Sequence, residues 1–337
     1  MKEIPCCRAA SLFFGSCCRV IWVILCIAQA LPLAASPQTV YPVKPLRIVV
    51  PNGAGGAADL TARAVGQKIS QRLGQPVIVE NKPGAGGVVA GDTVAKAAPD
   101  GHTLLLISSG TAVSASLFQT LPFATISDFT PVAQLASFDL VIVVPGGSRF
   151  KTLAELVAWS KAHPGKLNIG TPNIGTTQHL AAELFKSQAG LDAQIVPFNG
   201  TPAVINALRG DQVDVGLDIL SPLLAHTRSS DLRPLAITGN RRSRVLPEVP
   251  TAQEAGVAGF AVASWNGLAV PSKTPKAVVA RLNREIVAAL NDPGVRKLLQ
   301  DLNLDPQPGT PEQAAALLGS DIKRWNEVIV HARIPRQ

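Results

Sequence analysis

Apolar and polar positions along the chain form two alternating kinds of segment. Short continuous apolar runs, such as Leu46–Val50 ended by Pro51, predict buried strands. Longer segments with apolar residues at helical spacing, such as Leu60–Leu73, predict helices. Further strands are expected at Val77–Val79, Thr103–Ile107, Val141–Val144, Leu167–Ile169, Ile195–Val196, Val213–Leu217 and Leu235–Ile237, and further helices at 88–97, 153–162, 178–189 and 203–208. This alternation favours an α/β fold with parallel sheets covered by helices on both faces.

The C-terminal part follows a different pattern, with longer amphipathic segments that each begin near a proline. Pro275 opens a helical segment that runs through Leu290, Pro293 opens a second, and Pro311 opens a third that includes Trp325. Proline in the first turn is a common helix start because its missing N–H would have no partner there. We therefore expect the chain to end in helices.

The first 35 residues have the pattern of a signal peptide. Basic residues precede an apolar run from Val20 to Ala28, and small residues follow at 34–36. The run is too short to favour a transmembrane helix, which needs about 20 apolar residues. We predict export with cleavage after Ala35, or alternatively after Ala30.

Composition excludes several classes of function. All five cysteines lie within the predicted signal peptide, so the mature chain has no disulfide and no cysteine metal site. Aromatic residues make up only 4% of the chain, which leaves little material for stacking on bases or sugars. The net charge of +8 comes from scattered residues, except for the run 241–244, and does not predict nucleic-acid binding. Without a nucleophile elbow or a zinc-protease motif, we expect no enzyme, no cofactor and no metal.

The most distinctive local feature is the glycine-rich loop Pro51–Asp59 between a strand and a helix. Glycines allow close approach of backbone to a ligand, and a helix N-terminus presents N–H groups to an anion. A tight turn without any ligand remains an alternative. Gly53, Gly55 and Ala58 also fit a dinucleotide fingerprint, with Glu80 as the acidic residue. An exported protein meets little nicotinamide cofactor, so an NAD-dependent oxidoreductase is the weaker reading.

Other loops of the same character follow at 81–87, 170–179 and 198–202. They are far apart in the sequence, yet each joins a strand to a helix. Such loops gather at the carboxyl ends of the strands, where α/β proteins bind ligands. We therefore expect a ligand-binding cleft formed by several loops.

Together these motifs resemble the Bug proteins, the TctC-like periplasmic solute-binding proteins of tripartite tricarboxylate transporters. The resemblance includes Gly55-Gly56-x-x-Asp59 with Ala62-Arg63, and it continues nearly to the end of the mature chain. The other matching segments are 80–87, 99–101, 128–131, 175–180, 197–203, 210–214, 246–251, 254–256 and 271–275.

The resemblance implies a two-lobed periplasmic-binding-protein fold of type II, with two mostly parallel sheets, flanking helices and two crossover strands. Residues 41–137 with 265–337 would form lobe one, and 138–264 lobe two. The lobes would close around a carboxylate held by backbone amides and water. Carried over by position, the ligand contacts would be Asn52, Gly53, Ala54, Gly55, Gly56, Ala57, Thr171, Asn173, Gly175, Thr176, Thr177, Gln178, Phe198, Asn199, Gly200 and Asp218, with Asp59 and His179 behind them.

The function implied is capture of a small organic acid in the periplasm by a monomer that delivers it to the membrane permease subunits of a tripartite tricarboxylate transporter. A sensor that acts on a signalling partner is the alternative, since both roles use the same closed state. The sequence departs from the family at Asn52-Gly53, at Phe198-Asn199 and at Asn266. These positions can border the cleft, so the resemblance does not identify the ligand.

Overall fold

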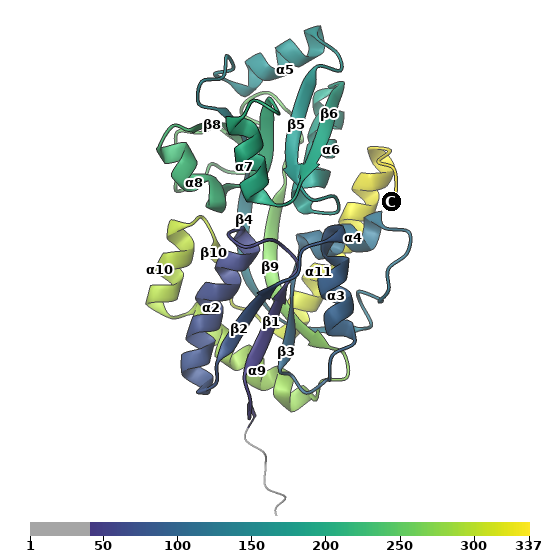
Figure 1. The fold of residues 1–337 in the computed structure, drawn as a ribbon, viewed down its shortest axis with the longest axis vertical. Coiled ribbons are helices and arrows are strands. Elements are labelled where there is room, and N and C mark those ends of the chain that lie inside the picture. Colours follow the sequence, from purple (N-terminus) through teal and green to yellow (C-terminus); the bar gives the residue numbers. More distant parts are fainter. Residues whose placement is uncertain (1–40) are drawn as a thin grey trace, which may run out of the picture. The chain divides into compact units, whose positions relative to one another are not determined.

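The structure, a computed structural model, describes residues 41–337, so the predicted signal peptide lies outside the described residues. The described chain forms two α/β lobes that share the long strand β4, Phe129–Pro145 (Figure 1). The strands form a mixed sheet in the order β2-β1-β3-β9-β4-β7-β5-β6, with β8 and β10 also paired to β4.

The first lobe holds the sheet around the first part of β4. Its other strands are β1 (Leu46–Val50), β2 (Val77–Asn81), β3 (Thr103–Ser108), β9 (Ala263–Pro271) and β10 (Asp305–Pro306). Its helices are the short 3-10 helix η1 (Ala85–Gly87), α2 (Ala57–Leu73), α3 (Val88–Ala95), α4 (Ser109–Leu117), α9 (Lys276–Leu290), α10 (Pro293–Asp301) and α11 (Pro311–His331).

The second lobe holds the sheet around the last part of β4. Its other strands are β5 (Leu167–Pro172), β6 (Ala193–Phe198), β7 (Val215–Ile219) and β8 (Leu232–Ile237). Its helices are α5 (Leu153–Ala162), α6 (Thr177–Ala189), α7 (Thr201–Arg209) and α8 (Leu220–Arg228). The predicted segments thus appear as strands and helices, whereas α4 and α8 were not anticipated.

The sheet is less parallel than the apolar runs suggested. The pairs β1–β2, β1–β3, β5–β6 and β5–β7 are parallel, as expected of strands joined through helices. The strands β4 and β9 are antiparallel to their neighbours and to each other, with Phe129 opposite Pro271 and Asp139 opposite Ala263. This follows from their role, because one carries the chain out of the first lobe and the other carries it back.

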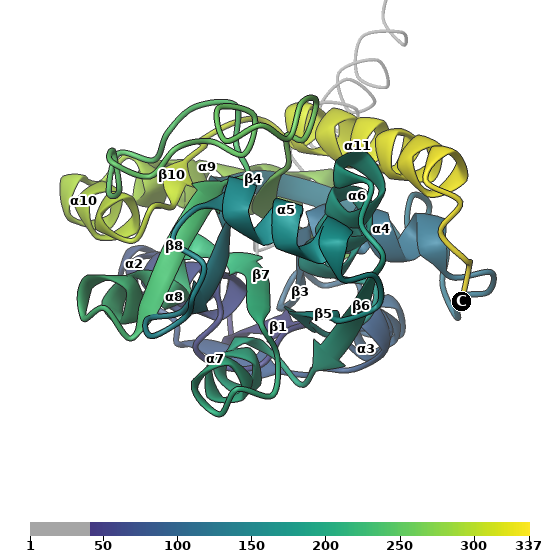
Figure 2. The ribbon, with the colours of Figure 1, turned by 90° about the horizontal axis from the view of Figure 1, so that it is seen from above.

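Helix α11 packs along the outside of both β4 and α4 (Figure 2). Trp325 of this helix is fully buried, and α4 and β4 are the elements that α11 contacts most. Its C-terminal part lies beside α6, where Arg324 and His331 border the same hollow as Leu184. The last helix therefore extends from the first lobe to the second.

Candidate functional site

A small cavity of about 50 Å³ lies between the two lobes, where strands end and helices begin. Helices α2, α3 and α4 begin at it from the first lobe, and α6, α7 and α8 begin at it from the second. Its wall consists of Pro51, Asn52, Gly53, Gly56, Ala57, Ala58, Gly84, Gly86, Gly87, Ser108, Gly110, Thr111, Phe138, Pro172, Asn173, Gly175, Thr176, Thr177, Gln178, Gly200, Thr201, Ile219, Ser264 and Asn266. None of these side chains carries a charge.

The start of α2 leaves its first backbone N–H groups available to a ligand. Its N-cap is Gly56, which has no side chain to accept hydrogen bonds from the first turn. The first N–H groups of a helix have no acceptor within the helix, so they attract anions. Ala57 and Ala58 follow with small side chains, and both line the cavity.

A polar network behind the cavity fixes this loop. The carboxylate of Asp59 accepts hydrogen bonds from Gly55 N at 3.0 Å and from Arg63 Nε at 3.0 Å. Asn81 Nδ2 donates to the carbonyl oxygen of Asn52 at 3.0 Å. Burial alone would raise the pKa of Asp59, but these hydrogen bonds from Arg63 and Gly55 outweigh it and lower the pKa. Asp59 therefore stays ionised and supports the loop from behind.

The start of α4 supplies a wall that sequence reasoning missed. The side chain of Ser108 accepts a hydrogen bond from Gly110 N, and Thr111 Oγ1 accepts one from Ser108 N. These contacts form a capping box, which stabilises a helix start. The helix is rich in serine, threonine and glycine, which are weak helix formers, so its apolar pattern was hard to detect. The signal available was Ser108 followed by Thr111 directly after a buried strand.

The second lobe contributes the starts of α6 and α7. Thr176 caps α6 by accepting a hydrogen bond from His179 N at 3.2 Å. The cap leaves the N–H groups of Thr177 and Gln178 without an acceptor in the helix, and both residues line the cavity. Gly200 precedes α7 with a φ of 86°, a conformation that favours glycine. His179, in the first turn of α6, is buried, and burial lowers the pKa of its imidazole.

The lobes touch through two glycines beside the cavity. A Cβ atom on Gly175 would lie 2.9 Å from a ring carbon of Phe118 and 3.1 Å from the Cα atom of Gly86. Ser114 Oγ lies 2.6 Å from the carbonyl oxygen of Gly86 and 3.1 Å from that of Gly175. The two lobes are therefore in direct contact beside the cavity.

Two side-chain amides face the cavity from opposite lobes. Gln178 Nε2 donates to Asp218 Oδ1 at 3.0 Å, and Asn266 Nδ2 donates to Thr61 Oγ1 at 3.1 Å. Asp218 has no exposed surface, and its burial raises the pKa of the carboxyl to about 6 despite the hydrogen bonds from Gln178 and Ile219 N. Asp218 therefore lies behind Gln178 and does not itself line the cavity.

The structure brings most of the expected ligand contacts together. Those that line the cavity are Asn52, Gly53, Gly56, Ala57, Asn173, Gly175, Thr176, Thr177, Gln178 and Gly200. Ala54 and Gly55 are exposed, whereas Thr171 and Asp218 are fully buried behind the wall.

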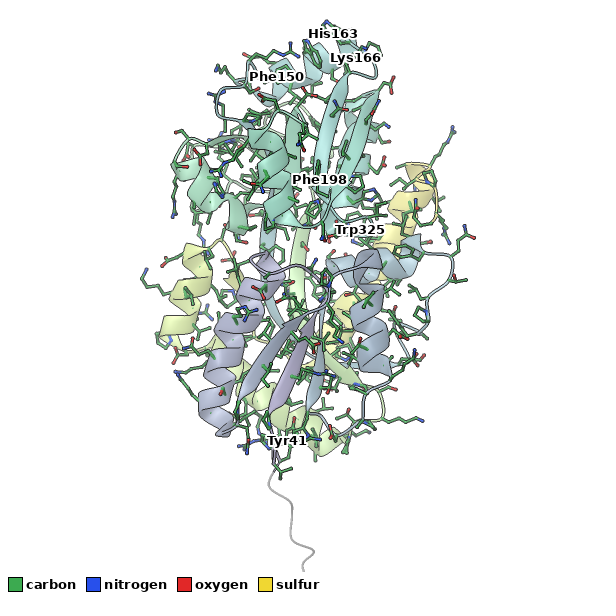
Figure 3. All side chains as sticks on the ribbon, in the orientation of Figure 1. Tyr41, Phe150, His163, Lys166, Phe198 and Trp325 are labelled. Atoms are coloured by element: carbon green, nitrogen blue, oxygen red, sulfur yellow. The ribbon has the colours of Figure 1, made fainter. Side chains whose placement is uncertain are left out.

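Phe198 and Asn199 line a neighbouring hollow that also includes Phe118 and Ile174. Phe198 lies in the second lobe at the end that faces the first (Figure 3). Those two departures from the family pattern therefore lie beside the cavity, while Asn266 lies in its wall.

The residues of the dinucleotide hypothesis have other partners. The carboxylate of Glu80 lies 3.1 Å from Arg47 Nη1 and 3.3 Å from Lys82 Nζ. Glu80 is thus occupied by two cations, and Lys82 is turned to Glu80 and is absent from the cavity wall. Within residues 41–337 no cluster of histidine or acidic side chains is arranged to hold a metal ion. Nor does this part of the chain contain a helix long and apolar enough to cross a bilayer.

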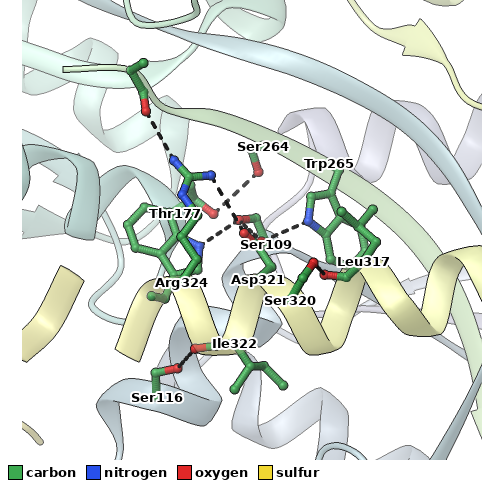
Figure 4. Close-up of polar contacts among 12 residues, drawn as sticks. Ser109, Ser116, Thr177, Ser264, Trp265, Leu317, Ser320, Asp321, Ile322 and Arg324 are labelled. Atoms are coloured by element: carbon green, nitrogen blue, oxygen red, sulfur yellow. Dashed lines mark hydrogen bonds and ion pairs between the residues drawn. The ribbon is translucent and has the colours of Figure 1, made fainter. Parts of the chain in front are cut away.

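A buried polar cluster holds the cavity wall to α11 (Figure 4). Asp321 Oδ2 accepts hydrogen bonds from Ser109 Oγ at 2.6 Å and from Trp265 Nε1 at 2.9 Å. Trp325 Nε1 donates to Ser109 Oγ at 3.1 Å. Ser109 follows Ser108, and Trp265 lies between Ser264 and Asn266, so the cluster supports two walls of the cavity from behind.

Comparison with known proteins gives a consistent result. Residues 61–334 match the family model of the tripartite tricarboxylate transporter family receptor, TctC. The chain is 35% identical to protein BugT of Bordetella pertussis over 315 residues, which cover 92% of this chain and 96% of BugT.

Solved structures agree with this match. MatC from Rhodopseudomonas palustris with bound malate is 35% identical, with a TM-score of 0.81 over 86% of this chain and 100% of MatC. A second R. palustris protein, solved with adipate, is 29% identical, with a TM-score of 0.85 over 88% of this chain and 99% of that protein.

Proposed function

Because the chain belongs to the TctC family of tripartite tricarboxylate transporter receptors, we propose that its cavity captures a small carboxylate and performs no chemistry on it. Members of this family are periplasmic solute-binding proteins, and the two similar R. palustris structures carry malate or adipate. The signal-peptide pattern at residues 1–35 supports a periplasmic location for this chain as well.

The convergence of six helix N-termini on a cavity without charged side chains is the observation that carries the proposal. Each such terminus favours an anion by about 0.3–1 kcal/mol when exposed and up to about 2 kcal/mol when partly buried. A hydrogen bond to a charged group adds about 1.5–3 kcal/mol. A few such bonds from each lobe support roughly micromolar affinity after the cost of association.

The contacts that would hold the carboxylate come mainly from backbone. We assign this role to the N–H groups at the starts of α2 and α6, together with the hydroxyls of Ser108 and Thr111. Asp59 and His179 support the first turns of these helices without reaching the ligand. Ordered water would complete the shell around the carboxylate.

Closure of the lobes around the ligand would then distinguish the loaded protein from the empty one before delivery. We propose lobe boundaries at 41–137 with 265–337 and at 138–264, because β4 pairs with β9 up to Asp139 and with β7 from Leu140. In this proposal the closed, liganded protein delivers its cargo to the membrane permease subunits of a tripartite tricarboxylate-type transporter. We propose that it does so as a monomer.

A thermal-shift screen of small organic acids on the purified mature protein tests this function. A ligand present at 100 times its dissociation constant raises the stability by about 2.7 kcal/mol. We expect at least one carboxylate to do so, and we expect Lys82→Ala to leave its affinity unchanged because Lys82 pairs with Glu80. If binding is lost in Lys82→Ala, the carboxylate is held by an ion pair and not by backbone.

A further inference from the structure

The amide of Asn266 is fixed with its nitrogen toward the protein. The hydroxyl of Thr61 donates to the carbonyl oxygen of Ala57 at 2.7 Å, so Thr61 Oγ1 can only accept from Asn266. Asn266 Nδ2 lies 3.1 Å from Thr61 Oγ1 and 3.4 Å from the carbonyl oxygen of Ala57. Both acceptors require the NH₂ group, which determines the orientation of the amide and engages both of its hydrogens.

Gln178 has the same orientation on the opposite wall. Its Nε2 donates at 3.0 Å to Asp218 Oδ1, which also accepts from Ile219 N at 2.7 Å. An ionised carboxylate only accepts hydrogen bonds, so the NH₂ group of Gln178 must face it. One N–H of Gln178 has no partner among the described residues, whereas both N–H groups of Asn266 are engaged. The orientation of the Asn266 amide is therefore the more tightly fixed of the two.

The carbonyl oxygens of these amides remain for the ligand. Neither Gln178 Oε1 nor Asn266 Oδ1 receives a hydrogen bond from the described residues, and neither belongs to the buried unpaired polar atoms of residues 41–337. Both residues line the cavity while being almost fully buried, and each of the two oxygens has no partner among the described residues. The cavity therefore presents acceptors as well as the N–H groups of the helix starts.

We infer that the ligand carries a hydrogen-bond donor, a hydroxyl or an amine, close to its carboxylate, and that Asn266 and Gln178 recognise this donor. A carboxylate alone repels carbonyl oxygens, whereas a 2-hydroxy or 2-amino acid satisfies them. This inference rests on the proposed function, because it names the class of acid that the same cavity selects. A site built to bond a donor discriminates strongly against the analogue that lacks it.

Three four-carbon diacids test the inference, since succinate, L-malate and L-aspartate differ only in bearing hydrogen, hydroxyl or ammonium at one carbon. Propionate, L-lactate and L-alanine form the matching three-carbon set. Titration calorimetry on the mature protein should show malate or aspartate, or lactate or alanine, binding at least tenfold more tightly than the unsubstituted acid.

Asn266→Ala should reduce that preference to less than threefold while the unsubstituted acid still binds. The change leaves no orphaned group, because the hydroxyl of Thr61 keeps its bond to Ala57. Asn283→Ala is the matched control: Asn283 Nδ2 also donates to two oxygens, those of Val132 and Gly309, but Asn283 lies outside the cavity wall. This control should keep the preference of the natural protein.

The outcomes separate the inference from the proposed function. Equal affinity for the substituted and unsubstituted acids overturns the inference and leaves carboxylate capture intact. So does a screen in which the only acids that bind lack a donor. If no organic acid binds at all, the proposed function fails and the inference fails with it. A preference that persists in Asn266→Ala overturns the role of Asn266.

Discussion

Ser114 in the first lobe and Gly175 in the second are joined by a hydrogen bond of 3.1 Å from the serine hydroxyl to the glycine carbonyl oxygen. The same hydroxyl lies 2.6 Å from the carbonyl oxygen of Gly86 in its own lobe, so its single hydrogen is shared between the two lobes at the edge of the cavity. An uncharged hydrogen bond contributes about 1 kcal/mol. Only the closed form makes this one, so it favours closure.

Replacing Ser114 with alanine should therefore weaken ligand binding by up to about fivefold, because the closed form loses its share of this bond, at most about 1 kcal/mol, relative to the open one. Titration calorimetry with the best acid from the screen measures the change. Ser116→Ala is the control on the same helix, since Ser116 Oγ donates within its own lobe to Ala112 and Ile322. Equal effects of the two substitutions would contradict a role in closure.

A substitution of Gly175 should impair closure more than the substitution of Ser114. An added Cβ would meet Phe118 at 2.9 Å and Gly86 at 3.1 Å across the lobes, so Gly175→Ala should lower ligand affinity at least a hundredfold. Its φ of 80° adds strain of about 1 kcal/mol for a residue with a side chain.

Gly190→Ala separates the strain from the clash. Gly190 has a φ of 64° and nothing within 4 Å of the added Cβ, so this variant should lose a similar amount of stability and keep its affinity. Small-angle scattering should show Gly175→Ala remaining open at saturating ligand concentrations. A closed Gly175→Ala with normal affinity would refute the contact.

Asp218 should make stability fall as the pH rises. Its pKa is about 6 in the folded protein against an ordinary value of 3.8, so between these values the folded protein keeps a proton that the unfolded chain has lost. The natural protein should lose about 2 kcal/mol relative to Asp218→Asn as the pH rises from about 4 to 7. Urea unfolding of both proteins across this range measures the difference.

Asp231→Asn is the control, because Asp231 should change stability with pH in the opposite direction from Asp218. Hydrogen bonds from Arg209 and His226 lower the pKa of Asp231, so the natural protein should gain stability relative to this variant as the pH rises through the acidic range. If the difference between natural protein and Asp218→Asn stays constant with pH, Asp218 is ionised at its ordinary pKa.

Asp321 should be important for stability. It accepts hydrogen bonds from Ser109 and Trp265 in a buried position. Asp321→Ala leaves both donors without their acceptor, and each bond to a charged group is worth about 1.5–3 kcal/mol, so the free energy of unfolding should drop by at least about 3 kcal/mol. Asp301→Ala, which removes an exposed pair with Lys297, should cost under about 1 kcal/mol. Thermal and urea unfolding of the two variants provide the comparison.

The sequence was most informative where apolar runs and turn residues agree. The strands around Val50 and Thr171 and the glycine loops after them were predicted because parallel strands place their following loops at one edge of the sheet. Asn173, Gly175 and Gly200 consequently line the cavity as expected.

Residues that reach the cavity by long-range pairing were harder to predict. Phe138 and Ser264 lie on the chain segments that cross between the lobes and face each other in β4 and β9, a register that no local pattern specifies. Ser108 and Thr111 were missed because a helix of small polar residues lacks an apolar stripe. Thr171 and Asp218 were assigned to the ligand by position from the family resemblance, and both are fully buried behind the residues that line the cavity.

The reliance of the cavity on backbone N–H groups has an evolutionary consequence. Substitution changes side chains but leaves the first turns of α2, α4, α6 and α7 in place. The backbone N–H groups therefore still bind a carboxylate after most substitutions of the residues that line the cavity. Residues such as Asn266 and Gln178 are then free to be exchanged without loss of the anion site. A single scaffold of this kind can acquire new cargoes by altering only the residues that meet the rest of the molecule.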